Sequence, residues 1–236
     1  MKAVLEVENL TISFGSNHVL TGVTFEVYEN EVLGVIGPNG AGKTCMLDII
    51  TGMLKPQKGK ILLHGIDLIP KSIVERTQMG LGRTFQIPRS FEKMTAYENI
   101  MTGGVYGDNL TEKKAGHRAV EILEVIGLSN RALSFAGELG LLDRKRLEIG
   151  IALASNPKLL LLDEVAGGLT ESEIANVLAI VANIKEAGIS VVWIEHVLQT
   201  MMHGTDRVML LAEGTNMICG DPGAVMASKE VELVYL

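Results

Sequence analysis

One stretch of eight residues decides the fold of this chain: Gly37-Pro38-Asn39-Gly40-Ala41-Gly42-Lys43-Thr44. It matches the phosphate-binding loop pattern G-x-x-x-x-G-K-[ST] at every fixed position. The apolar residues 32–36 lead into the loop as a predicted strand, and residues 45–50 leave it as a predicted helix that ends at Gly52. Glycines let backbone amides point at a phosphate that lies on the positive end of that helix. The stretch therefore predicts a nucleoside triphosphate site, with Lys43 on the β- and γ-oxygens and the Thr44 hydroxyl on Mg²⁺.

The composition restricts the classes of protein to which the chain can belong. Of its 236 residues, 47% are hydrophobic but only 4% are aromatic, so we expect an aliphatic core. The net charge of −7 argues against a nucleic-acid partner, because surfaces that bind DNA or RNA are basic. No apolar run approaches the ~18 residues that span a bilayer, and the first residues lack the apolar core of a secretion signal. Two cysteines without metal-ligand spacing, Cys45 and Cys219, are typical of a reduced cytosolic protein.

The first part of the chain is predicted to form short strands, and their short connections favour antiparallel pairing. These strands are expected at residues 4–8, 23–28, 31–36 and 60–64. Helical periodicity dominates further along the chain, as in the helix that Thr111 is expected to cap and Gly127 to end.

Strand and helix patterns then alternate again. Residues 159–162 and 189–194 are continuous apolar runs, as expected of buried parallel strands. Residues 170–173 form a capping box at the start of a helix, and residues 207–211 and 216–219 are predicted to pair as a terminal hairpin. The predicted organisation is one α/β domain, residues 1–236, with a nucleotide core at 1–87 and 156–236 and a helical subdomain at about 88–155.

A second motif, acidic in character, supplies what hydrolysis requires beyond phosphate binding. The apolar run at 159–162 ends in Asp163 and Glu164. We expect Asp163 to hold Mg²⁺ and Glu164, at the exit of the strand, to polarise the attacking water as a general base. Taken alone, the pair is equally compatible with a buried strand that ends in two solvated carboxylates. The phosphate loop upstream favours the hydrolytic interpretation.

Two further polar side chains are candidates for the same site. His196 ends the strand at 189–195, where a histidine can contact a γ-phosphate, although a lone histidine is more often structural. Gln86 follows residues 82–85 at the boundary between core and insert, where it can touch both the water shell of the metal and the insert. Spacing alone leaves the structural alternative open for both. The other histidines are interpreted as structural: His18, His64, His117 and His203.

Together these motifs resemble the ATP-binding subunits of ABC transporters, and the resemblance covers essentially the whole chain. It implies a P-loop NTPase fold of the ABC type, with an antiparallel β subdomain and a helical insert that docks on a membrane partner. It also implies a head-to-tail dimer that holds two ATP molecules between its subunits. The implied ATP-binding residues are Phe14, Gly37, Pro38, Asn39, Gly40, Ala41, Gly42, Lys43, Thr44, Cys45 and Gln86. The implied Mg²⁺ ligands are Thr44, Gln86 and Asp163, and the implied catalytic residues are Glu164 and His196.

Two segments resemble one particular group within this family. Residues 82–99 look like the Q-loop stretch of branched-chain amino-acid importer ATPases, and residues 231–236 are similar to the tail of that group. Importers of urea and short amides share both features. The resemblance thus implies a peripheral subunit on the cytoplasmic face of the membrane that energises import of a small solute. Its implied partners are transmembrane permeases, a second ABC ATPase subunit and an extracytoplasmic solute-binding protein.

One family motif is altered in this chain. The family signature Leu-Ser-Gly-Gly-Gln binds the γ-phosphate held by the opposite subunit, and the aligned residues here are Leu139, Gly140, Leu141, Leu142 and Asp143. The change removes the serine hydroxyl, adds two side chains where a positive φ would become costly, and places a carboxylate beside a triphosphate. Backbone amides at the start of the helix are still expected to attract an anion. The change predicts an asymmetric heterodimer with one poorly active site, or else a variant that the family tolerates.

Two further residues differ from the family motifs, and three other classes of protein are alternatives to a transporter subunit. Thr170 replaces the usual D-loop aspartate, and Val165 replaces the proline after the catalytic glutamate. The rivals are a soluble ABC ATPase without a transporter, a small-molecule P-loop kinase, and a regulatory subunit that binds nucleotide but scarcely hydrolyses it. A kinase would not explain Gln86, Glu164 and His196 in this order.

Overall fold

A computed structural model describes residues 2–235 of the chain, and its first sheet is a small antiparallel one. The strand order is β2-β1-β4-β5, and β1 pairs antiparallel with both β2 and β4. The strands are β1 (Ala3–Phe14), β2 (Asn17–Tyr28), β4 (Lys58–Leu63) and β5 (Ile66–Asp67). β1 and β2 extend well beyond the short strands expected from their apolar cores, and several register shifts between them accommodate this length.

The second sheet positions the nucleotide site. Its order is β10-β9-β3-β8-β7-β6, parallel except for β10, which pairs antiparallel with β9. The strands are β3 (Val32–Ile36), β6 (Leu81–Arg83), β7 (Leu159–Asp163), β8 (Ser190–Ile194), β9 (Arg207–Ala212) and β10 (Thr215–Gly220). Every residue of β3, β7 and β8 is buried, as their continuous apolar sequences predict. Because β3, β8 and β7 are neighbours, the residues at their carboxyl ends meet at one edge of the sheet.

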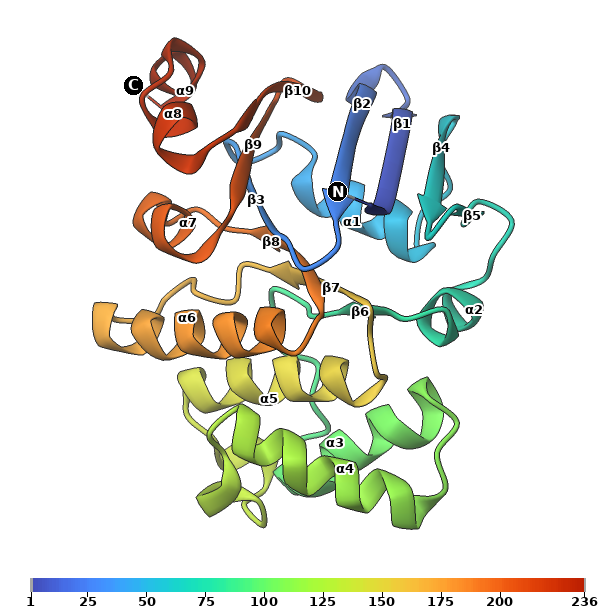
Figure 1. Cartoon of the computed structure of the whole chain (residues 1–236), viewed down its shortest axis with the longest axis vertical. Coiled ribbons are helices and arrows are strands. Elements are labelled where there is room, and N and C mark those ends of the chain that lie inside the picture. Colours follow the sequence, from blue (N-terminus) through green and yellow to red (C-terminus); the bar gives the residue numbers. More distant parts are fainter. Residues whose placement is uncertain (1, 236) are drawn as a thin grey trace.

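Helices fill the remaining layers, and Figure 1 shows α3, α4 and α5 gathered at the end of the molecule opposite the antiparallel sheet. The helices around the sheets are α1 (Lys43–Thr51), α2 (Ile73–Gln78), α6 (Glu171–Glu186), α7 (Leu198–Gly204), α8 (Pro222–Met226) and α9 (Lys229–Tyr235). Those of the opposite end are α3 (Ala96–Thr102), the π-helix η1 (Gly103–Gly107), α4 (Glu112–Val125), the 3₁₀ turns η2 (Ser129–Arg131) and η3 (Ala136–Glu138), and α5 (Leu141–Ala154). We propose that this second group is the helical subdomain expected at about 88–155.

Two apolar cores hold these layers together. One lies between the two sheets and α1, with Leu33, Leu47 and Ile61 fully buried. The other lies between the second sheet and the helices beneath it, and includes Leu147 and Trp193. Within residues 2–235, no helix is both long enough and apolar enough to cross a membrane.

The two helix starts predicted from capping residues differ in their hydrogen bonds. Thr170 precedes α6, and its amide and hydroxyl both donate to the Glu173 carboxylate at 2.8 Å, as the capping box predicts. Thr111 occupies the position before α4, but its side chain makes no capping hydrogen bond. The hairpin of β9 and β10 does not end the chain, because α8 and α9 follow it.

Candidate active site

The phosphate loop begins where β3 ends, and its glycines are required by the backbone. Gly37 has φ 154°, and a Cβ there would lie 2.0 Å from the Leu211 carbonyl oxygen. Gly42 has φ 98° at the start of α1, and a Cβ there would lie 2.6 Å from Leu20. Only glycine fits at either position. The loop can therefore curl against β9 and β2 and still present its amides to an anion.

The Lys43 side chain turns back into this loop. Its Nζ donates to the carbonyl oxygens of Gly37 at 2.7 Å and of Pro38 at 3.0 Å. Burial lowers the pKa of Lys43, and the nearby Glu164 and Asp163 carboxylates oppose that shift. A phosphate would give this ammonium anionic partners in place of neutral carbonyls, which favours phosphate binding.

A cavity of about 510 Å³ opens over the loop. It is lined by Asn17, Val19, Asn39, Gly40, Ala41, Gly42, Lys43, Thr44, Cys45, Gln86 and Glu164. Gly37 and Pro38 are not among its lining residues. The structure thus brings most of the expected ATP-binding residues around one cavity whose size suits a nucleotide. Asn17 and Val19 were missed, because only the pairing of β2 with β1 places them there.

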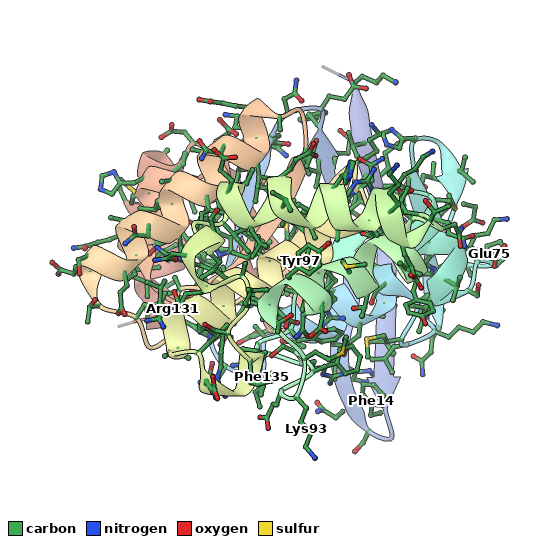
Figure 2. The ribbon with its side chains drawn as sticks, turned by 90° about the horizontal axis from the view of Figure 1, so that it is seen from below. Phe14, Glu75, Lys93, Tyr97, Arg131 and Phe135 are labelled. Carbon is green, nitrogen blue, oxygen red and sulfur yellow. The ribbon has the colours of Figure 1, made fainter. Side chains whose placement is uncertain are left out.

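Phe14, the expected adenine partner, lies at the tip of the β1–β2 hairpin, at the edge of the molecule (Figure 2). It pairs with Asn17, which lines the cavity, but Phe14 itself does not line it. Its side chain is 53% exposed. The aromatic ring therefore lies beside the cavity, and its stacking on a base stays a prediction.

Asp163 ends β7 and is almost completely buried. Its Oδ2 accepts a bond from Arg83 at 3.3 Å, while its Oδ1 has no hydrogen-bond partner. Burial raises the pKa of Asp163, and the Arg83 guanidinium opposes that shift. A buried carboxylate oxygen without a partner is costly, and a divalent cation is a fitting partner for it. The Thr44 hydroxyl is exposed and, like Gln86, lines the cavity, so the expected oxygen ligands suit Mg²⁺.

Glu164 has an unusual backbone conformation. Its φ of 52° lies in the left-handed region, which costs a non-glycine residue on the order of 1 kcal/mol. Two contacts hold it there: its amide donates to the Ile194 carbonyl at 3.0 Å, and its carbonyl accepts from Lys145 Nζ at 2.7 Å. The carboxylate accepts a bond from Gln86 Nε2 at 2.5 Å and also contacts His196 Nε2. The structure therefore brings three of the expected residues into direct contact.

One participant was missed by the sequence reasoning. Glu195, at the end of β8, is fully buried, and its Oε1 accepts bonds from the Ala166 amide at 2.5 Å and from Trp193 Nε1 at 3.2 Å. Burial raises the pKa of Glu195, and these hydrogen bonds oppose that shift. The carboxylate ties the segment after Glu164 to the end of β8, just before His196. The sequence did contain a signal for this role: a glutamate that follows an apolar strand and directly precedes a candidate histidine.

The altered signature opens α5, the helix whose Lys145 contacts the Glu164 carbonyl. Leu141, Leu142 and Asp143 form the first turn of α5, and Gly140 caps it with φ −66°. The expectation of a costly positive φ is wrong, because the segment enters a right-handed helix directly. Asp143 pairs with Arg146 at 3.4 Å, and a carboxylate in a first turn is favourable to the helix dipole. Leu139 is buried while Leu141 is 49% exposed. None of the five residues lines the cavity over the phosphate loop.

Known proteins resemble this chain over its whole length. The protein-family profile described as "ABC transporter" matches residues 20–167. BraF, a high-affinity branched-chain amino acid transport ATP-binding protein of Pseudomonas aeruginosa, is 32% identical over 100% of this chain and 98% of its own. LptB, a lipopolysaccharide export system ATP-binding protein of Haemophilus influenzae, is 31% identical over 99% and 97%. The solved ATP-binding cassette MJ1267 superposes with a TM-score of 0.93 at 30% identity and covers 100% of both chains. A second structure of MJ1267, in its ADP conformation, gives 0.91 at 29% identity, with 100% of this chain and 99% of that chain covered.

Proposed function

The chain belongs to the ABC transporter family as an ATP-binding, ATP-hydrolysing subunit, and from that premise we propose that it energises import of branched-chain amino acids. The observation that carries the proposal is its likeness, at 32% identity over nearly all of both chains, to BraF of Pseudomonas aeruginosa and LivG of Escherichia coli. The stretch at 82–99 supports the same choice. Export of a lipid is the second candidate, because the likeness to LptB is equally extensive.

We assign the hydrolytic steps to residues that meet around the cavity. The loop amides and Lys43 hold the β- and γ-phosphates. Thr44, Gln86 and Asp163 hold Mg²⁺, which neutralises phosphate charge when it is bound. Glu164 accepts the proton of the water that attacks the γ-phosphate, and His196 orients the Glu164 carboxylate.

The proposed membrane partner docks between the core and the helical layer. An apolar groove of about 280 Å³ lies there, with Met53 and Ile73 exposed at its wall. Arg83 also lines the groove, and its guanidinium pairs with Asp163. A permease segment seated in this groove would thus touch a side chain that contacts the proposed Mg²⁺ ligand. We propose two permeases, a second ABC ATPase and an extracytoplasmic solute-binding protein as the full set of partners, with this chain on the cytoplasmic face of the membrane.

We further propose that the second ATPase differs from this chain. The segment Leu139–Asp143 offers the opposite nucleotide no serine hydroxyl, and its carboxylate repels a γ-phosphate. The site built on Lys43 and Glu164 would be completed by an intact signature from the partner. The other site would bind ATP and turn over slowly. Vigorous hydrolysis by the isolated chain, equal to that of the complex, would contradict this asymmetry.

The transported class is tested in reconstituted membranes. The chain is purified with the permeases and second ATPase that accompany it, placed in liposomes, and supplied with its solute-binding protein. We expect leucine, isoleucine or valine to stimulate ATP hydrolysis and to accumulate in the direction of import. Stimulation by urea or a short amide alone would reassign the solute, and stimulation by a lipid without any amino-acid effect would favour export.

A further inference from the structure

The C-terminal helix reaches the start of the phosphate loop. The Tyr235 hydroxyl, in α9, accepts a hydrogen bond of 2.8 Å from the Gly37 amide, 198 residues away in sequence. The carbonyl of the same Gly37 accepts the 2.7 Å bond from Lys43 Nζ. A single loop residue therefore lies between the tail hydroxyl and the ammonium that is expected to hold phosphate.

The Gly37 amide has no partner in the sheet. The pairing of β3 with β9 ends at Ile36 and Leu210, and that of β3 with β8 ends at Val35 and Ile194. A backbone amide at a strand end needs a partner or water. Tyr235, which is still 36% exposed, supplies that partner. Partial burial raises the pKa of its phenol, and the bond from the Gly37 amide opposes that shift. The hydrogen bond fixes the orientation of the peptide on which the loop begins.

The helix that carries Tyr235 is anchored on the core by Val231 and, in part, by Val234. Val231 is buried and contributes to the core, and its amide donates to Ser228 Oγ at 3.3 Å. By contrast, Leu233 is 81% exposed. A helix of seven residues does not persist without tertiary contacts. A cavity of about 370 Å³ separates part of α9 from Leu198, which begins α7 two residues after His196. The tail thus lies beside both the phosphate loop and the segment that follows the histidine.

We propose that Tyr235 is a positioning residue for the phosphate loop, through which docking of the C-terminal helix sets the affinity for nucleotide. Its hydroxyl holds the Gly37 peptide, and Gly37 in turn orders the loop before a phosphate arrives. A loop that is already ordered loses less conformational entropy on binding. The inference rests on the proposed placement of the polyphosphate in loop 37–44. Tyr235 does not line the cavity that Glu164 and Gln86 share, so the chemical step is not part of its role.

The variant Tyr235→Phe tests this role in the full chain, because it removes the hydroxyl and keeps the ring. We expect the dissociation constants of Mg-ATP and Mg-ADP, measured by displacement of a fluorescent nucleotide, both to rise about five-fold, the size of one neutral hydrogen bond. In the assembled transporter, KM for ATP should rise by the same factor while kcat stays within two-fold. The matched control is Leu233→Ala, on the exposed side of the same helix, which should change neither constant.

Further variants separate the ways in which the inference can fail. Unchanged dissociation constants in Tyr235→Phe, or a fall in kcat with KM unchanged, would overturn it. An equal effect of Leu233→Ala would also overturn it, as would a large drop in melting temperature in Tyr235→Phe. Val231→Ala, which loosens the anchor of α9, should reproduce the change in affinity. If Lys43→Ala leaves nucleotide affinity intact, the placement of the phosphate itself is refuted. If Lys43→Ala weakens nucleotide binding and Tyr235→Phe does not, the phosphate placement stands and only the positioning role of Tyr235 is refuted.

Discussion

Replacing Glu164 with glutamine separates the binding of ATP from its hydrolysis in this site. The carboxylate contacts Gln86 Nε2 and His196 Nε2. A glutamine of the same shape can accept the first bond with its carbonyl oxygen and donate the second from its amide to a neutral imidazole. The backbone contacts of residue 164 to Ile194 and Lys145 do not involve the side chain. The variant should therefore keep the geometry and lose only the proton acceptor.

The expected magnitude follows from that single loss. A positioned general base contributes about 10²- to 10⁴-fold to a rate. We expect kcat to fall at least about 100-fold, which corresponds to about 2.7 kcal/mol of transition-state free energy. The affinity for ATP should stay equal or increase, because one negative charge near the phosphates is removed. A loss of binding is not expected.

The assay measures both quantities on one preparation. Phosphate release is followed in a single turnover at saturating Mg-ATP, and the dissociation constant is measured separately with a fluorescent nucleotide. Glu121→Gln, which removes the same charge from an exposed position on α4, is the matched control and should behave as wild type. Turnover of Glu164→Gln within three-fold of wild type would remove Glu164 from its role. Loss of ATP binding would show instead that the residue supports the site structurally.

Three further predictions address the loop, the stability of its helix and the buried carboxylate beside His196. Lys43→Ala should weaken ATP binding and lower kcat/KM, with a loss of transition-state stabilisation on the order of 3 kcal/mol, the size of one lost charged donor. An unchanged kcat/KM would contradict the assignment. Arg76→Met should reduce the free energy of unfolding by about 3 kcal/mol, because the guanidinium donates three hydrogen bonds to backbone carbonyls, two of them buried at the end of α1; calorimetry should show a clear drop in melting temperature. Burial raises the pKa of Glu195, so the folded state keeps a proton that the unfolded state releases, and stability falls as pH rises through that interval. Glu195→Gln should flatten this decline in urea unfolding above about pH 4, where an unfolded glutamate loses its proton, and an unchanged slope would refute the cause.

The parts of the fold that the sequence could predict are those specified by neighbours along the chain. The loop at 37–44 has its glycines, its lysine and its flanking elements in one contiguous stretch, so the pattern alone indicates the backbone path. The run that ends in Asp163 and Glu164 is equally local. These motifs predicted the resemblance to ABC transporter ATPases and the fold class. Both predictions are confirmed by the family match and the solved cassettes. With the family established, the small-molecule kinase is excluded.

Contacts between distant segments could not be predicted in the same way. The bond between Tyr235 and Gly37 joins residues that are 198 positions apart, and no local pattern encodes it. The burial of Glu195 depends on where the segment at Ala166 runs after β7. Helix α8 was also missed, although Asp221 followed by Pro222 is a recognised start, with the Asp221 carboxylate accepting from the Ala224 amide at 3.0 Å. Its five residues are too few for periodicity to reveal.

The altered signature is not explained by packing within this subunit. A Cβ at Gly140 would meet no atom within 4 Å, so the fold has room for the missing serine. Asp143 is paired with Arg146 on its own helix and favours the start of α5, so the carboxylate is accommodated as well. Neither residue strains the helix, and neither is imposed by a clash with its surroundings. The packing of this subunit is therefore compatible with both interpretations of the altered segment: a variant that the family tolerates, or a partner that supplies the intact signature. The second interpretation is the asymmetry proposed for the dimer, and the rate of ATP hydrolysis by the isolated chain distinguishes it from the first.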